Sequence, residues 1–256
     1  MLIDSHAHLT LPQFDDDREM VIQRAREAGL KHIITVGLDI EDSHKAIMLT
    51  DEYDFIFASI GVHPHDVKSI GTKTYSQLKK LSDHHKVVAI GEIGLDFYRN
   101  LSPRKIQFQR FREQLQLARE VSLPVIIHDR EAHEDTVQIL QEEGVETIGG
   151  VIHCFSGDLK MANACLDLGF YISIPGTITF KNSREYRDIV RELPLNRLLV
   201  ETDCPFLTPH PFRGKRNEPA YVRYTAETIA RLKNIDVAEL AEITTANAQN
   251  LFHLSV

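Results

Sequence analysis

Two histidines separated by a single residue, His6 and His8, follow an apolar opening of the chain. On a β-strand, residues i and i+2 point to the same side, so both imidazoles can reach one metal ion. An ordinary hydrophobic core does not require two histidines at this spacing. The pair therefore indicates a metal site at the end of a strand, where a bound ion could activate water.

Further short apolar runs also end in residue types that ligate metals. They are Val87 to Glu92, Val125 to His128, Gly150 to His153 and Leu198 to Asp203. A lone strand-end histidine such as His128 is more often a hydrogen-bonded polar residue, but the joint occurrence of these residues favours ligation. Strand ends that converge on one place predict a metal-dependent enzyme.

Imidazoles mixed with carboxylates suit zinc, manganese, magnesium or related divalent ions. Two neighbouring ions need a bridging anion and about three or four ligands each. We expect Glu92 to be the bridge, because an unpaired carboxylate in a buried run would be costly. We assign the other ligands as His6, His8 and Asp203 to one ion, and His128 and His153 to the other. A shared water would then be activated, with Asp203 accepting its proton.

Short β-like runs alternate along the chain with segments of helical spacing or loop character. The runs are 2–6, 32–37, 55–62, 87–92, 124–128, 150–154, 170–174 and 198–202. The clearest helices are predicted at 18–28, ended by Gly29, and at 41–51, 103–121, 218–232 and 237–252. Continuous apolar strands that alternate with helices are typical of a parallel sheet covered by helices.

Eight such units predict a (β/α)8 TIM barrel, an α/β fold that commonly takes about 250 residues. The chain has 256 residues, so we expect a single domain over 1–256, with the last helix added to cap or brace the barrel. Active sites of such barrels lie at the carboxyl ends of the strands. All six predicted ligands fall at that end.

The overall charge limits how a polyanion could bind. A formal net charge of −8 argues against a surface that attracts nucleic acid in bulk, so such a substrate would be gripped locally. The three cysteines lack paired spacing and fit reduced thiols. Because no secretory signal or membrane-length apolar run is visible, we expect a cytoplasmic protein without membrane contact. No obligate protein partner is evident.

Several segments, in this order, resemble the TatD family of metal-dependent hydrolases, a branch of the amidohydrolase-like barrels. They are LIDSHAHL, GVHPHD, VAIGEIGLDF, LPVIIHDREAHED, GGVIHCFSG and LLVETDCPFL. The resemblance extends over essentially the whole chain. It implies a (β/α)8 barrel, deoxyribonuclease-like hydrolysis of phosphodiester bonds in DNA, and metal positions at His6, His8, Glu92, His128, His153 and Asp203.

Three other residues near these motifs have more than one interpretation. His63 closes the third strand and could contact a phosphate or serve a turn, and the resemblance favours substrate contact. Arg130 could approach an anionic substrate or pair with a carboxylate. Glu201 shares a face with Asp203 but lies deeper, so we expect it to orient a ligand rather than bind metal.

The segment after the last strand concentrates positive charge at Arg213, Lys215 and Arg216. Taken alone, this is a solvated surface loop, since short basic loops are common on acidic proteins. With the family resemblance, all three become candidate contacts to a nucleic-acid strand.

Three functions remain open at this stage. The first is a DNA hydrolase that acts on single strands from an end, because an open barrel rim accepts a strand terminus easily. The second uses the same metal centre on a small amide, lactone or ester. The third is a non-catalytic binding protein, which the ligand set opposes because structural zinc sites are closed by four protein ligands.

Overall fold

The apolar runs form parallel strands that neighbour one another in chain order, from β1 to β8. The computed structural model describes residues 1–254. Its strands are β1 (Leu2–Ala7), β2 (Leu30–Val36), β3 (Ile56–Ile60), β4 (Val87–Asp96), β5 (Val125–Arg130), β6 (Gly150–Ile152), β7 (Tyr171–Ile174) and β8 (Leu198–Val200). The predicted (β/α)8 barrel is confirmed.

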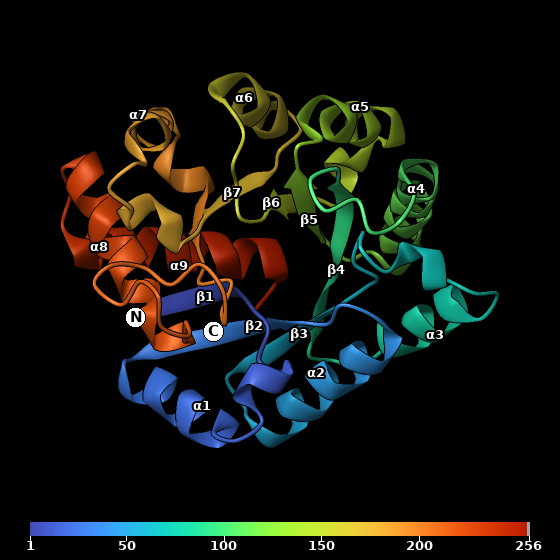
Figure 1. Ribbon diagram of the computed structural model, residues 1–256, viewed down its shortest axis with the longest axis horizontal. Helices are drawn as coiled ribbons and strands as arrows, with labels where there is room; N and C mark the ends of the chain where they lie inside the picture. The colour runs from blue at the N-terminus through green and yellow to red at the C-terminus, as the bar shows by residue number, and fades with distance from the viewer. Residues whose placement is uncertain (255–256) are drawn as a thin grey trace.

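Apart from the last one, α9, the helices form a ring outside the strands (Figure 1). The helices are α1 (Arg18–Glu27), α2 (Ile40–Glu52), α3 (Thr74–Leu81), α4 (Arg104–Val121), α5 (His133–Glu143), α6 (Leu159–Asp167), α7 (Arg184–Glu192), α8 (Val222–Lys233) and α9 (Val237–Phe252). Gly29 follows α1 with a φ of +80°, as its predicted place at the helix end requires. No helix within residues 1–254 is long and apolar enough to cross a membrane.

The additional C-terminal helix α9 packs against the end of the barrel where the strands begin. Leu251 and Phe252 join a buried cluster with barrel residues that include Ile3 and Leu199. The Asn247 side-chain amide donates to the Leu198 carbonyl at the start of β8, at 2.9 Å. Because α9 covers this end, the opposite end of the barrel is left for the site.

The barrel closes between β8 and β1 through a few contacts. Backbone hydrogen bonds join Asp203 N–H to the His6 carbonyl (2.9 Å) and His8 N–H to the Cys204 carbonyl (2.8 Å). Deeper in the seam, the Thr202 hydroxyl donates to the buried Asp4 carboxylate at 2.6 Å. These contacts hold the segment after β8 beside the two histidines of β1.

Some strands end at other residues than predicted, and backbone conformation explains where β6 and β8 end. β4 continues beyond Glu92 to Asp96, whereas β6 and β8 end at Ile152 and Val200. Asp203, and Cys154 directly after His153, have positive φ values of 54° and 46°, so the chain turns out of the sheet there. His153 and Asp203 therefore lie in the segments that follow β6 and β8.

Candidate metal centre

The predicted ligands gather in one place at the carboxyl end of the barrel. His6 lies on β1, Glu92 on β4 and His128 on β5. His8 and His153 directly follow β1 and β6, and Asp203 lies three residues after the end of β8. All six side chains are largely buried. His128 and Asp203 are the most open, with side-chain exposures of 14% and 13%.

The first group of ligand atoms surrounds the two histidines of the opening motif. His6 Nε2 and His8 Nε2 are 3.2 Å apart. Glu92 Oε2 lies 3.3 Å from His6 Nε2 and 3.7 Å from His8 Nε2. Asp203 Oδ1 lies 3.2 Å from His8 Nε2 and 3.9 Å from His6 Nε2. This is the set of residues that the sequence assigned to one ion.

The second group surrounds the other oxygen of Glu92. Glu92 Oε1 lies 2.6 Å from His128 Nδ1 and 3.0 Å from His153 Nε2. His63 Nε2 also approaches this oxygen, at 3.4 Å. The two oxygens of one carboxylate therefore face two different groups of imidazoles, as the predicted bridging role of Glu92 requires.

The distances within the first group fit a divalent metal ion. A tetrahedral zinc site with bonds of about 2.0–2.2 Å places its ligand atoms roughly 3.3–3.6 Å apart. The separations of 3.2 and 3.3 Å from His6 Nε2 to His8 Nε2 and Glu92 Oε2 are close to that spacing. The donors are the nitrogen and oxygen types that zinc and manganese accept. These side chains are therefore suited to bind divalent metal ions, as the sequence pattern predicted.

Two glycines allow β4 to lie close to β5, which places Glu92 beside His128. A Cβ atom on Gly91 would lie 2.7 Å from the Ile126 carbonyl oxygen, and one on Gly94 would lie 2.0 Å from that of His128. Gly94 also has a φ of +142°, which disfavours any other residue. The GEIG segment thus serves to position the bridging carboxylate.

Glu201 lies fully buried behind His153. Its Oε1 accepts a hydrogen bond from Cys154 N–H at 2.7 Å and lies 3.2 Å from His153 Nδ1. His153 presents its other nitrogen, Nε2, to Glu92. A carboxylate on one ring nitrogen orients the ring and makes the opposite nitrogen a better ligand. The contact supports the orienting role expected for Glu201.

Sequence reasoning missed Asp96 and His65. Asp96 Oδ2 lies 3.1 Å from His128 Nε2 and 2.8 Å from His65 Nε2, and Asp96 is fully buried. The contact orients His128 so that its Nδ1 faces Glu92. Two signals could have found these residues. His63 and His65 repeat the spacing of His6 and His8, and Asp96 ends the run that continues after Glu92.

The site favours ionised carboxylates beside a mixture of neutral and protonated imidazoles. Burial lowers the pKa of His6 to about 3 and that of His63 to about 4. Burial alone would raise the pKa of Glu92, but His153, His63 and His128 together hold it well below its usual value.

The other three imidazoles shift the other way. For His8, burial is outweighed by Asp203 and Glu92, and the pKa is raised. Burial opposes protonation of His128, but hydrogen bonds to Asp96 and Glu92 outweigh it and raise the pKa to about 9. For His153, burial is likewise outweighed by Glu92 and Glu201, and the pKa lies well above its usual value. His128 is therefore protonated on both ring nitrogens near pH 7 before an ion binds, and the pKa of His153 is shifted in the same direction.

Metal binding is expected to release protons. Imidazole must be neutral to ligate, so His128 must lose a proton, and the raised pKa values of His8 and His153 act in the same direction. Metal affinity should therefore fall as the pH drops below about 9. Calorimetric titration of the metal-free protein with Zn²⁺ near pH 7, in two buffers of different ionisation enthalpy, measures this release. A heat of binding that is the same in both buffers would contradict the assignment.

The predicted substrate contacts divide into exposed and engaged side chains. Arg213 and Lys215 are exposed, and Arg130 is exposed at the end of β5. Arg216 instead makes two hydrogen bonds of 2.7 Å to the Asp17 carboxylate and packs over Phe14. Its guanidinium thus anchors the loop to the segment before α1. The exposed positive charge of the loop lies on Lys215 and on Arg213, which packs over the Phe180 ring at 4.3 Å.

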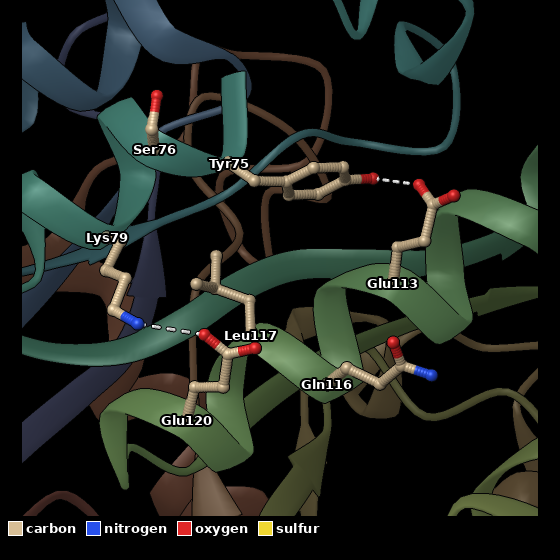
Figure 2. Close-up of a pocket in the computed structure, with 7 residues that line it drawn as sticks. All are labelled: Tyr75, Ser76, Lys79, Glu113, Gln116, Leu117 and Glu120. Atoms are coloured by element: carbon tan, nitrogen blue, oxygen red, sulfur yellow. Dashed lines mark hydrogen bonds and ion pairs between the residues drawn. The ribbon is translucent and has the colours of Figure 1, made fainter. Parts of the chain in front are cut away.

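A surface hollow between α3 and α4 lies away from these ligands (Figure 2). Its polar groups already pair across the two helices. Tyr75 donates to Glu113, and Lys79 donates to Glu120 at 3.0 Å. The hollow contains none of the predicted site residues.

Comparisons with known proteins find matches over nearly the whole chain. A family model described as TatD related DNase matches residues 3–253. A Bacillus subtilis protein named "Uncharacterized metal-dependent hydrolase YabD" is 51% identical, over 100% of both chains. An Erwinia tasmaniensis protein named "3'-5' ssDNA/RNA exonuclease TatD" is 39% identical, over 99% of this chain and 100% of the relative. The crystal structure of the Escherichia coli TatD homologue YjjV superposes with a TM-score of 0.93 at 33% identity, and covers 99% of this chain and 98% of that one.

Proposed function

Because the chain belongs to the TatD family of metal-dependent hydrolases, we propose that it hydrolyses phosphodiester bonds of DNA and acts on single strands from an end. The observation that carries the proposal is the position of Glu92, whose Oε2 and Oε1 lie 3.3 Å and 2.6 Å from His6 and His128. A carboxylate between two groups of imidazoles suits a two-metal clamp, which serves in-line displacement at phosphorus. The name of the Erwinia relative supports the choice of substrate.

The six predicted ligands would hold two divalent ions, which could be zinc, manganese or magnesium. His63 would lie beside the second group of ligands. When bound, such ions lower the pKa of a water towards neutrality and offset negative charge on the phosphate. His6, His8, Glu92 and Asp203 would hold one ion, and Glu92, His128 and His153 the other. Asp96 and Glu201 would keep His128 and His153 turned towards Glu92.

Asp203 would accept the proton of the attacking water. Its Oδ1 lies 3.2 Å from His8 Nε2, and its side chain is more open to solvent than that of Glu92 or either histidine of β1. A carboxylate that both belongs to the cluster and reaches the open side can take a proton as the nucleophile forms. Arg130, which follows His128 by two residues, would contact the phosphate from the rim.

The direct test of the proposed function is cleavage of end-labelled oligonucleotides. Purified protein is incubated with single-stranded and duplex DNA in Mn²⁺, Mg²⁺ or Zn²⁺, with and without a chelator. The proposal expects stepwise shortening of the single strand, lost on chelation and restored by added metal. Absence of chelator-sensitive cleavage with every metal would overturn it.

Charge reversal in the loop after β8 separates a nucleic-acid substrate from a small one. Phosphate contacts supply much of nucleic-acid affinity, so Arg213→Glu with Lys215→Glu should raise the KM for an oligonucleotide about tenfold or more at low salt. It should leave the rate on a small carboxylic ester unchanged. Steady-state kinetics at two salt concentrations measures both effects.

A matched control reverses two charges elsewhere. Lys79→Glu with Lys80→Glu changes the last turn of α3, which leads towards the start of β4 at the other end of the barrel. This variant should keep the KM of the wild type. If loop reversal leaves the oligonucleotide KM unchanged while small-ester hydrolysis is efficient, a small amide, lactone or ester is the substrate instead.

A further inference from the structure

Two large side chains at the carboxyl end of the barrel are exposed although they are aromatic. Tyr98 follows β4 and is 54% exposed, and Phe206 follows β8 and is 46% exposed. Because β4 and β8 are four positions apart in an eight-stranded order, their loops lie on opposite sides of the barrel mouth. The predicted metal ligands lie between them.

We propose that Tyr98 and Phe206 each stack against a base of a single-stranded nucleic acid, on opposite sides of the metal ligands. This inference rests on the proposed function and adds to it the residues that select an unpaired strand. Bases stack readily on aromatic side chains, and this contact tolerates any sequence. A base must be unstacked from a duplex to make it.

Phe206 is held in place beside a ligand. Its ring centroid lies 6.2 Å from that of His8, in an edge-on arrangement. Its backbone N–H donates to the Asp203 carbonyl at 2.9 Å. The side-chain amide of fully buried Asn217 donates to the carbonyls of Phe206 (2.6 Å) and Thr202 (2.8 Å). The backbone is thus fixed so that the ring stays exposed next to the site.

Tyr98 is held on the other side, together with a positive charge. The guanidinium carbon of Arg130 lies 4.0 Å from the centre of the Tyr98 ring. The backbone joins the same two segments, since Phe97 N–H donates to the Arg130 carbonyl at 2.9 Å. An aromatic ring and a guanidinium in contact offer a stacking face for a base and a charge for the adjoining phosphate.

Single exposed aromatic residues are common on protein surfaces and need no ligand. Tyr98 and Phe206 differ because their backbones are fixed by hydrogen bonds on opposite sides of the barrel mouth, and because Arg130 stacks on Tyr98. A small ester or amide would need no stacking surface on both sides. The unpaired bases of a strand passing over the ligands would use both.

The test combines protein variants with a change in the base. Tyr98→Ala and Phe206→Ala are assayed on an oligothymidylate and on the same strand with 5,6-dihydrothymidine, whose ring is not aromatic, near the cleaved end. For the wild type, kcat/KM should fall about fivefold or more with the altered base. In the alanine variants, kcat/KM should be nearly the same for the two strands. In Tyr98→Phe and Phe206→Tyr, kcat/KM should again fall with the altered base as in the wild type. Met48→Ala, an exposed apolar residue on α2, is the control.

The same measurements distinguish base stacking by Tyr98 and Phe206 from a role in which they only support the structure of the site. Damage to the metal ligands would lower cleavage of both strands equally and leave the base response intact, which would overturn the stacking role. A second readout needs no cleavage, because an oligonucleotide with 2-aminopurine should lose fluorescence on binding to the metal-free wild type and keep it with the double alanine variant. Wild-type cleavage without any base response would refute this inference alone, whereas no wild-type cleavage would refute the proposed function.

Discussion

Glu92→Gln is expected to reduce hydrolysis by about 10³-fold or more. The carboxylate lies 2.6 to 3.4 Å from imidazole nitrogens of both groups, and an amide cannot ligate through two anionic oxygens. Metal ions supply several kcal/mol of transition-state stabilisation, which corresponds to a factor of this size. Cleavage assays at saturating metal, together with the metal content per chain, measure the loss.

The control for this variant is Glu120→Gln on α4, where an exposed glutamate pairs with Lys79 far from the ligands. It should keep wild-type activity and metal content. Thermal unfolding in the presence of a chelator shows whether Glu92→Gln still folds. A folded Glu92→Gln variant with wild-type activity would contradict the bridging role.

The second large effect is expected for Asp203→Asn. Loss of a general base typically costs about 10²- to 10⁴-fold in rate, and asparagine keeps the size of the side chain while removing its proton affinity. Because Asp203 also approaches His8 Nε2 at 3.2 Å, the affinity for one ion should weaken. Single-turnover cleavage at increasing metal concentration separates the two effects, since added metal restores occupancy but not the proton acceptor.

Asp54→Asn provides the comparison, because Asp54 is fully exposed in the turn before β3. Its activity should equal that of the wild type. If excess metal restored Asp203→Asn to the full wild-type rate, Asp203 would be a ligand only, and the proton would pass to another group.

The barrel and the location of its site could be predicted because the relevant signals are local. Each strand is a short apolar run, and each ligand stands at or just after the end of one, so a pattern of a few residues places it. His6 and His8 illustrate this, since the alternation of a strand alone brings their Nε2 atoms to within 3.2 Å. The match to the TatD family adds independent support for the fold.

The parts that escaped prediction depend on contacts between distant segments. Arg216 looked like a free charge in its loop, but its partner Asp17 lies 199 residues away in the chain. Asp96 lies beyond the predicted strand end at Glu92, and only the register of β4 with β5 places it against His128. Tyr98 is similar, since its neighbour Arg130 comes from the next strand.

The most direct measurement is an anomalous difference map from crystals of the protein grown with Mn²⁺ or Zn²⁺. The account predicts two peaks about 3.5–4 Å apart, one on each side of the Glu92 carboxylate. One should lie among His6, His8 and Asp203, and the other beside His128 and His153. Peaks remote from these six side chains, or no peak in protein that hydrolyses DNA with the same metal, would contradict it.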